Sequence, residues 1–427
     1  MQILVIGSGG REHAVIKALK KSPKVDALYC CPGNGGIAAD ATCIPIKATD
    51  IEGVVAFAKE KAIDLVFVTP DDPLVLGMVD ALEEAGIRAF GPRKNAAILE
   101  GSKVFSKNLM KKYGIPTARY ETFDNEEEAA AYVKDQNTYP TVIKADGLAL
   151  GKGVLIAGSE EEALEAIHSI MGDKIFGASG NRIVIEEFLE GPEVSVLSFT
   201  DGKTLAPMVS SKDHKRALDG DRGLNTGGMG TIAPNPYYTP EIAERCMEEI
   251  FLPTMEAMNA EGRTFKGCLY FGLMLTKNGP KVIEYNCRFG DPETQVVLPR
   301  MKNDIVDVFE ACVDGTLDQV ELDFEDNAAV CVVLASAGYP EHYEKGYRIE
   351  GLEKFKDQDG YYVFHAGSKF DAEGNIVTNG GRVLGVTAKG KDLEEARANA
   401  YKAAEWVEFG NKYMRGDIGK AIDELIG

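Results

Sequence analysis

The first hundred residues alternate short runs typical of buried strands with segments whose apolar residues recur at helical spacing. The strand-like runs, each bounded by turn residues, are ILVIG, ALYCC, LVFVT and IRAFG. The helical segments lie at 12–21, 51–61 and 74–85. This alternation predicts a doubly wound parallel sheet, and such sheets bind ligands at the carboxyl ends of their strands.

Beyond residue 101 the pattern changes to a mixture of helices and antiparallel strands. The segment VFSKNLMKKY predicts a helix that ends at Gly114, and a second helix is expected at 160–171. Further strands are expected in TVIKAD, GVLIA and RIVIEEF, and at 193–199, 205–209, 267–275 and 281–285. The last part contains VCVVLAS, YYVFHAG, RVLGVTA and a closing helix at 393–409.

We therefore predict an α/β and α+β multidomain protein. Its parts are an N-terminal Rossmann-like substrate domain at 1–101, a central body at 102–327 with an inserted lid at about 119–192, and a small C-terminal α+β domain at 328–427.

Composition narrows the class of partner. The 427 residues include 47 Lys and Arg against 67 Asp and Glu, a net charge of −20. Nucleic acid and anionic membranes are therefore not expected, because both need a basic face. The eight cysteines form no CxxC pair and lie in apolar stretches, as reduced thiols do. With no signal-peptide pattern and no apolar run long enough to cross a bilayer, we expect a cytoplasmic protein.

The first glycine-rich turn, Gly7-Ser8-Gly9-Gly10, lies between the first strand and the first helix. It does not complete a dinucleotide-binding fingerprint, because Glu12 stands where the third glycine belongs and Cys30 and Cys31 lie where the ribose-binding acid is expected. The turn instead predicts a nest of backbone amides for one phosphate. A second turn, Pro32–Gly36, follows the second strand on the same sheet edge, and the alternative is two tight turns without a ligand.

The second glycine-rich element, Lys144 to Gly153, joins two strands. It is not a Walker A loop, because three residues rather than four separate Gly147 from Gly151 and no Ser or Thr follows Lys152. A lysine at a strand end before a flexible loop is typical of a flap that folds over nucleotide phosphates. Lys103 is another candidate phosphate ligand, and the alternative for each lysine is a solvated surface residue.

The run from Ile183 to Leu189 passes directly from apolar residues to Glu186 and Glu187. This order suggests a hinge whose backbone pairs with an adenine edge, with Glu193 placed for ribose hydroxyls. The alternative is a strand end that meets water.

Glu284 and Asn286 stand two apart on a predicted strand, so both side chains project from one face. Oxygen ligands at this spacing suit Mg²⁺, which usually takes one or two protein groups together with phosphates and water. Arg288 follows closely and is placed to neutralise charge on a transferring phosphoryl group. The alternative is a surface ion-pair cluster, and no serine-hydrolase or HExxH zinc motif is found anywhere in the chain.

Lysine, glycine-rich flap, Glu-Glu-Phe-Leu hinge and Glu-x-Asn strand, in that order, resemble the ATP-grasp superfamily. Five further motifs narrow the resemblance to the phosphoribosylamine–glycine ligase family, and it covers nearly the whole chain. They are Gly9-Gly-Arg-Glu-His-Ala, Asp213-His-Lys-Arg, Asn225-Thr-Gly-Gly-Met-Gly, Arg288-Phe-Gly-Asp-Pro-Glu-Thr-Gln and Thr378-Asn-Gly-Gly-Arg382-Val-Leu.

The resemblance implies an ATP-grasp body, and ATP, glycine and 5-phosphoribosylamine as substrates. It also implies a glycyl phosphate intermediate in purine biosynthesis and Mg²⁺ or Mn²⁺ as the metal. Separately, we expect a monomer. Two alternatives stay open: another purine-pathway ATP-grasp ligase or carboxylase, and a nucleotide-binding regulator without catalysis.

The resemblance also assigns roles to individual residues. Near ATP it places Lys103, Lys144, Gly151, Lys152, Gly153, Glu186, Glu187, Leu189 and Glu193. Near the sugar phosphate it places Gly9, Gly10, Asn34 and Gly35; at the metal, Glu284 and Asn286; at the reacting centre, Asp213 and Arg288. Asp71 and Ile37 depart from the residues usual in this family near the sugar-phosphate pocket, and the strand 269–275 lacks the acid that many ATP-grasp enzymes carry there.

Overall fold

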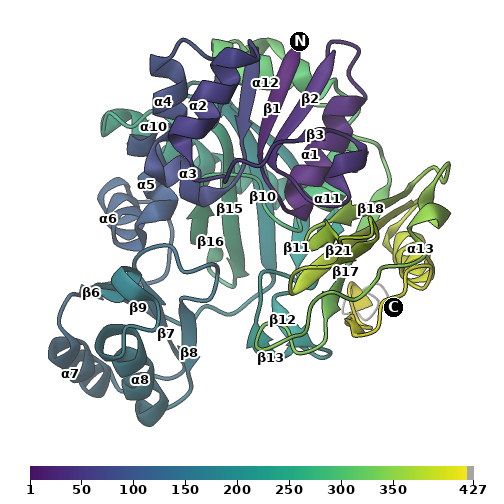
Figure 1. Cartoon of the computed structure of the whole chain (residues 1–427). Helices are drawn as coiled ribbons and strands as arrows, with labels where there is room; N and C mark the ends of the chain where they lie inside the picture. The colour runs from purple at the N-terminus through teal and green to yellow at the C-terminus, as the bar shows by residue number, and fades with distance from the viewer. Residues whose placement is uncertain (421–427) are drawn as a thin grey trace.

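The computed structural model describes residues 1–420, and its N-terminal part is a five-stranded parallel sheet with helices packed around it (Figure 1). The strands, in spatial order, are β3 (Thr42–Cys43), β2 (Ala27–Pro32), β1 (Gln2–Gly7), β4 (Leu65–Val68) and β5 (Ala89–Phe90). The helices are α1 (Gly10–Lys20), α2 (Ile51–Glu60), α3 (Asp71–Leu76), α4 (Met78–Glu84) and α5 (Lys94–Gly101). The predicted doubly wound parallel sheet is confirmed.

One predicted helix of this region is divided. The expected continuous helix at 74–85 is wrong, because the chain breaks at Gly77 into α3 and α4. Gly77 has φ +94°, a left-handed backbone that glycine adopts without penalty.

A nine-stranded sheet forms the centre of the molecule. Its main path runs β16 (Gly279–Asn286), β15 (Lys266–Thr276), β10 (Glu193–Asp201), β11 (Leu205–Asp213), β14 (Gly230–Ala233), β17 (Ala328–Ser336), β21 (Arg382–Gly390) and β18 (Tyr361–His365), with β22 (Lys412–Tyr413) beside β17. Further helices outside the N-terminal part and the lid are α6 (Lys103–Tyr113), α9 (Pro240–Cys246), α10 (Leu252–Ala260), α11 (Thr294–Val297), α12 (Ile305–Asp314) and α13 (Leu393–Ala404). Two small hairpins are β12 (Arg216–Leu218) with β13 (Arg222–Asn225), and β19 (Ser368–Phe370) with β20 (Ile376–Thr378).

The lid projects from this body as a separate four-stranded antiparallel sheet with two helices (Figure 1). Its strands, in spatial order, are β6 (Tyr120–Phe123), β9 (Ile183–Glu187), β7 (Thr141–Ala145) and β8 (Val154–Ala157). The helices are α7 (Glu126–Gln136) and α8 (Glu160–Ile167). The two helices and the inward faces of the strands bury a core of their own.

The C-terminal strands join the central sheet instead of forming a sheet of their own. β17 pairs with β14 along Gly230–Ala233, so the hydrogen bonding continues past residue 328. The closing helix predicted at 393–409 is too long, because α13 ends at Ala404. The next residues turn so that Val407 and Phe409 enter the core and Glu408 exchanges backbone hydrogen bonds with Glu350.

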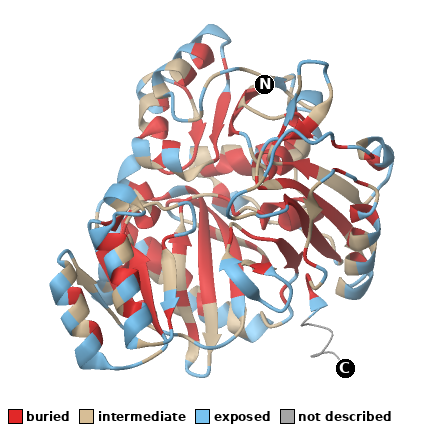
Figure 2. Ribbon diagram, turned by 60° about the horizontal axis from the view of Figure 1, so that its bottom comes forward, coloured by how far each residue is buried: buried red, intermediate tan, exposed pale blue. Residues whose placement is uncertain are grey.

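Buried residues follow the strands of both large sheets, and the outer helix faces are exposed (Figure 2). A cluster of five aromatic rings joins the N-terminal sheet to the central one: Phe67, Phe90, Phe199, Phe289 and Phe309. Because Phe289 follows Arg288 directly, this core fixes the backbone of the predicted reacting centre. No helix within residues 1–420 has the length and apolar character that crossing a membrane requires.

Candidate active site

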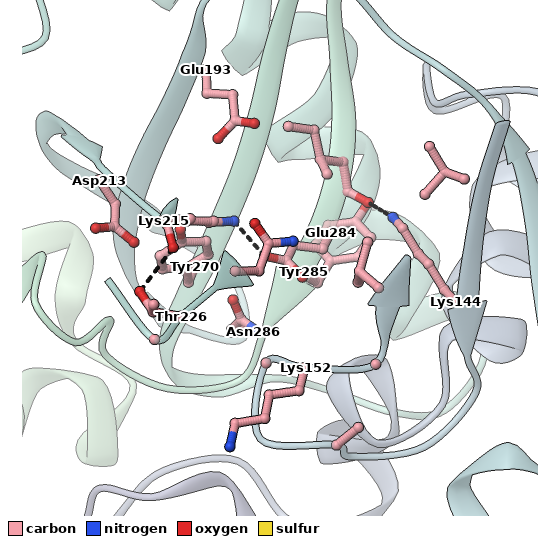
Figure 3. Close-up of a pocket in the computed structure, with 18 of the residues that line it drawn as sticks. Lys144, Lys152, Glu193, Asp213, Lys215, Thr226, Tyr270, Glu284, Tyr285 and Asn286 are labelled. Carbon is pink, nitrogen blue, oxygen red and sulfur yellow. Dashed lines mark hydrogen bonds and ion pairs between the residues drawn. The ribbon is translucent and has the colours of Figure 1, made fainter. Parts of the chain in front are cut away.

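A cavity of about 1020 Å³ is lined by residues of the lid, the central sheet and the C-terminal strands. Most of the predicted site residues meet there, although they come from distant parts of the sequence (Figure 3). Those that line it are Lys103, Lys144, Gly151, Lys152, Gly153, Glu186, Glu187, Leu189, Glu193, Asp213, Glu284, Asn286 and Arg288.

The lid side of the cavity is built around one buried carboxylate. Glu186 on β9 lies 2.9 Å from Lys144 Nζ on β7 and 2.8 Å from Lys107 Nζ on α6. Burial alone would raise the pKa of Glu186, but the two lysines outweigh it and hold the pKa below its ordinary value. Lys144 Nζ also donates to Ile283 O on β16, which ties the lid to the central sheet. The side chain of Glu186 therefore faces the lysines, and its backbone carbonyl accepts from Thr141 Oγ1 at 3.1 Å, so the adenine contact at this residue stays a prediction.

The hinge continues at Glu187, the last residue of β9, whose carboxylate also has a basic partner. The Glu187 carboxylate accepts hydrogen bonds from the backbone and the guanidinium of Arg119, at 3.0 and 3.3 Å. Glu193 begins β10 and directs its carboxylate into the cavity (Figure 3).

Lys103 begins α6, and its position is fixed by a local cap. Ser102 caps the helix by accepting from Phe105 N, and its hydroxyl donates to Asp146 at 2.9 Å. Lys103 Nζ donates to Gly147 O at the base of the flap, 3.1 Å away. Burial lowers the pKa of Lys103, partly offset by Glu284. Lys103 thus contacts the base of the glycine-rich flap directly.

The Glu-x-Asn pair lies on β16, at the centre of the cavity floor (Figure 3). Lys215 Nζ is 3.4 Å from Glu284 Oε1. Burial would raise the pKa of Glu284, but Lys215, Lys144 and Lys103 lower it to about 2, so this carboxylate is ionised at neutral pH. Asn286 donates through Nδ2 to Glu100 Oε2 at 3.1 Å. Its carbonyl oxygen is therefore the atom left for a cation.

The predicted reacting centre, Arg288 and Asp213, also contains charged groups. Arg288 lies 3.2 Å from Glu100 Oε2, and despite burial that carboxylate and nearby Asp71 raise the pKa of Arg288. Asp213 ends β11 and accepts from His214 N at 2.7 Å. Burial and the neighbouring Glu293 raise the pKa of Asp213 well above its usual range.

The four residues predicted near the sugar phosphate lie outside the cavity lining: Gly9, Gly10, Asn34 and Gly35. Asn34 uses its side chain to join three segments, because Nδ2 donates to Ser8 O and His365 O, and Oδ1 accepts from Gly36 N and Ile37 N. Gly35 N donates to Ser368 O. The backbone amides of the second turn thus already have partners inside the protein, and a phosphate site at the two turns stays a prediction.

Several charged residues of the cavity carried no assigned role from the sequence. They are Arg11, Glu100, Lys107, Lys212, Lys215, Glu293 and Arg382. Lys215 and Arg382 fall within motifs that the sequence does single out, so a wider reading of those motifs identifies them. Lys107 carries a weaker signal, its spacing of four from Lys103, which places both on one helix face.

Comparisons with known proteins agree with this arrangement. Three family profiles match in chain order: the phosphoribosylglycinamide synthetase N domain over residues 1–100, its ATP-grasp (A) domain over 101–294 and its C domain over 329–421. The phosphoribosylamine–glycine ligase of Halalkalibacterium halodurans is 50% identical over 425 residues, covering 99% of this chain and 98% of that protein. The enzyme of the same name from Vibrio vulnificus is 50% identical, with 98% of each chain covered.

Solved structures give the same result. The crystal structure of phosphoribosylamine–glycine ligase from Thermotoga maritima has a TM-score of 0.84 and 38% identity, and covers 98% of this chain and 100% of that one. The biotin carboxylase domain of Hydrogenobacter thermophilus 2-oxoglutarate carboxylase has a TM-score of 0.75 at 19% identity and covers 97% of this chain and 91% of that one, a likeness of fold alone. The chain belongs to the phosphoribosylamine–glycine ligase family, within the ATP-grasp superfamily.

Proposed function

We propose that this protein joins glycine to 5-phosphoribosylamine at the expense of ATP, giving glycinamide ribonucleotide, ADP and phosphate in purine biosynthesis. The observation that carries the proposal is the meeting, in one cavity, of the flap, the hinge, the Glu-x-Asn strand and Arg288 in a chain that belongs to this family. Catalysis of this kind depends on positioning and charge neutralisation rather than on a covalent nucleophile.

ATP binds, in this proposal, between the lid and the central sheet. Lys103, Lys144, Lys152 and the flap glycines Gly151 and Gly153 contact the phosphates. The hinge from Glu186 through Leu189 contacts adenine through its backbone, and Glu193 binds the ribose. The surplus of lysines at this wall offsets the triphosphate charge within an acidic protein.

The donor set fits a divalent cation bound together with the nucleotide. Glu284 is ionised and Asn286 presents a carbonyl oxygen, and hard oxygen donors suit Mg²⁺ or Mn²⁺. Within residues 1–420 no group of three or more His, Cys, Asp or Glu is arranged to hold a metal by itself. Two protein ligands therefore need nucleotide phosphates and water to complete the shell. A cation there would offset the charge on the phosphates.

The chemistry then runs in two balanced steps. A glycine carboxylate oxygen attacks the γ-phosphorus of ATP, the bond to the bridging oxygen breaks, and ADP leaves with that electron pair. The amine of 5-phosphoribosylamine attacks the carbonyl carbon of glycyl phosphate, and phosphate leaves as the amide forms. Arg288 offsets charge on the acyl phosphate. Asp213 lines the same cavity, and its carboxylate, when ionised, is placed to accept the proton that the amine loses.

The test uses glycine labelled with ¹⁸O in its carboxylate. We expect one labelled oxygen in the phosphate released, because the attacking oxygen leaves with the phosphoryl group. Release of unlabelled phosphate would contradict carboxyl activation. Release that depends on bicarbonate or formate instead of glycine would favour the other ATP-grasp reactions, and failure to release phosphate would favour a regulator.

We further propose that the enzyme works as a monomer in the cytoplasm and that its units are 1–101, 102–327 with the lid at about 119–192, and 328–427. Light scattering at increasing protein concentration tests the monomer. Limited proteolysis tests the division, with cleavage expected first around the lid boundaries.

A further inference from the structure

Glu100 occupies a position that is costly for a carboxylate. It lies in the last turn of α5, where the helix dipole disfavours negative charge, and only 8% of the residue is exposed. A charge buried in this way must be compensated by partners. The groups that compensate this charge therefore indicate the role of Glu100.

All three partners are consecutive residues, namely the last residue of the Glu-x-Asn strand and the two residues that follow it. Cys287 N donates to Oε1 at 2.8 Å, Asn286 Nδ2 donates to Oε2 at 3.1 Å, and Arg288 Nη2 lies 3.2 Å from Oε2. The same turn of α5 makes a fourth contact, because Cys287 Sγ donates to Ala97 O at 3.3 Å. The C-terminal turn of α5 thus holds the segment that carries both the proposed metal ligand and the proposed catalytic arginine.

The hydrogen bond to Asn286 decides which end of its amide is available. Because Nδ2 is held by Glu100, the carbonyl oxygen is the free end, and only an oxygen can bind Mg²⁺ or Mn²⁺. A turned amide would present two N–H donors to the cation instead. The same carboxylate oxygen limits the positions open to the Arg288 guanidinium.

We propose that Glu100 is a positioning residue that orients the Asn286 carbonyl toward the metal and holds Arg288 at the reacting centre. This inference rests on the proposed function, since it needs the metal at Glu284 and Asn286. Glu100 does not bind the metal itself, because Oε2 is shared by two donors and Oε1 accepts from the backbone. Partners of metal ligands commonly change metal affinity by about 10- to 100-fold.

The test compares Glu100→Gln with wild type in two measurements. The first is Mn²⁺ affinity, followed by electron paramagnetic resonance of the enzyme with a non-hydrolysable ATP analogue. The second is the kinetics of glycine-dependent ADP formation. We expect Mn²⁺ affinity to fall about tenfold and kcat about tenfold or more, with the KM for ATP changed less than about threefold.

Two further variants keep the result interpretable. Glu100→Asp preserves the charge and protects folding, and we expect smaller losses in the same direction. Glu83→Gln, an exposed acid on α4 paired with Arg93, is the matched control and should leave both measurements unchanged.

Wild-type Mn²⁺ affinity in both Glu100 variants would overturn the inference, and so would a loss of kcat matched by an equal loss of folded protein. If wild type itself shows no glycine-dependent ADP formation, the proposed function fails instead, so the two failures are distinguishable.

Discussion

The N-terminal glycine turns and the flap of the lid are both glycine-rich, yet their glycines meet different surroundings. In the turns a Cβ has no room: one built on Gly36 would lie 2.0 Å from Cγ of His365, and one on Gly10 would lie 2.6 Å from Gln295 Nε2. At the tip of the flap, Gly151 has nothing within 4 Å of such an atom, and neighbouring Leu150 is 75% exposed.

This difference separates two uses of glycine that a sequence pattern does not distinguish. In the turns glycine allows chain segments to approach closely, and the backbone amides of the second turn are largely used for that packing. In the flap it leaves an exposed loop that can follow a ligand. Only the base of the flap is packed, since a Cβ on Gly147 would lie 2.6 Å from Ser179 Oγ.

The largest effect is expected for Gly36→Ala. Gly36 has φ −84°, which any residue adopts, so the whole penalty is the collision with the buried His365 ring. We expect the free energy of unfolding to fall by about 3 kcal/mol, measured by urea denaturation. Gly158→Ala is the control, because its Cβ meets only the end of the Glu162 side chain, at 3.4 Å. Equal stability of the two variants would show that the close contact at Gly36 has no energetic cost, which contradicts the comparison.

Local pattern explains why much of the architecture was predictable. The parallel strands, the lid strands and the Glu284–Asn286 pair all follow from short stretches whose periodicity or spacing is visible in the sequence. The site residues on these stretches arrived in one cavity because strands position side chains rigidly.

What escaped prediction depends on contacts between distant segments. Glu100 meets its partners 186 and 187 positions later, and Lys107 meets Glu186 across two elements. The break at Gly77 and the pairing of β17 with β14 are likewise set by packing rather than local preference. A buried lysine or glutamate looks like a solvated one until its partner is known.

A smaller effect is expected at the base of the lid, where the packed part resembles the turns. Lys144→Met removes one of the two lysines that compensate Glu186, and we expect stability to fall by about 2 kcal/mol and ATP affinity about tenfold or more. The matched variant is Lys152→Met at the exposed tip, where stability should not change and ATP affinity should fall less. Calorimetry with ATP and thermal unfolding measure both. Equal losses of stability in the two variants would show that base and tip do not differ.

Acid should affect the turns through His365. Burial lowers the pKa of His365 to about 3. Repulsion from His13 and Lys17 adds to this shift, and Asp40 opposes it. In the unfolded chain His365 binds a proton as the pH falls through about 6.5, while in the folded chain it stays neutral. The stability that the neutral His365 contributes is therefore complete above pH 6.5 and is lost as the pH falls toward 3. Between pH 7.5 and 5.5 it amounts to about 1.4 kcal/mol of unfolding free energy. In His365→Asn the fall over this interval should be smaller by that amount, and an identical pH profile would contradict the assignment.

The smallest effect is expected for Gly151→Ala, which tests the exposed tip of the flap. Gly151 has φ +73° and no neighbour within 4 Å, so alanine there pays only for a left-handed backbone, about 1 kcal/mol. The loop already holds a larger side chain in this conformation, because Leu150 has φ +54°. Urea denaturation should therefore show a loss near 1 kcal/mol, and kcat should fall less than about fivefold, the rate equivalent of the same energy. A loss as large as that of Gly36→Ala would mean that the flap tip is packed against the body in solution. In that case the glycine turns and the flap tip would both be tightly packed, and they would differ only in which residues surround them.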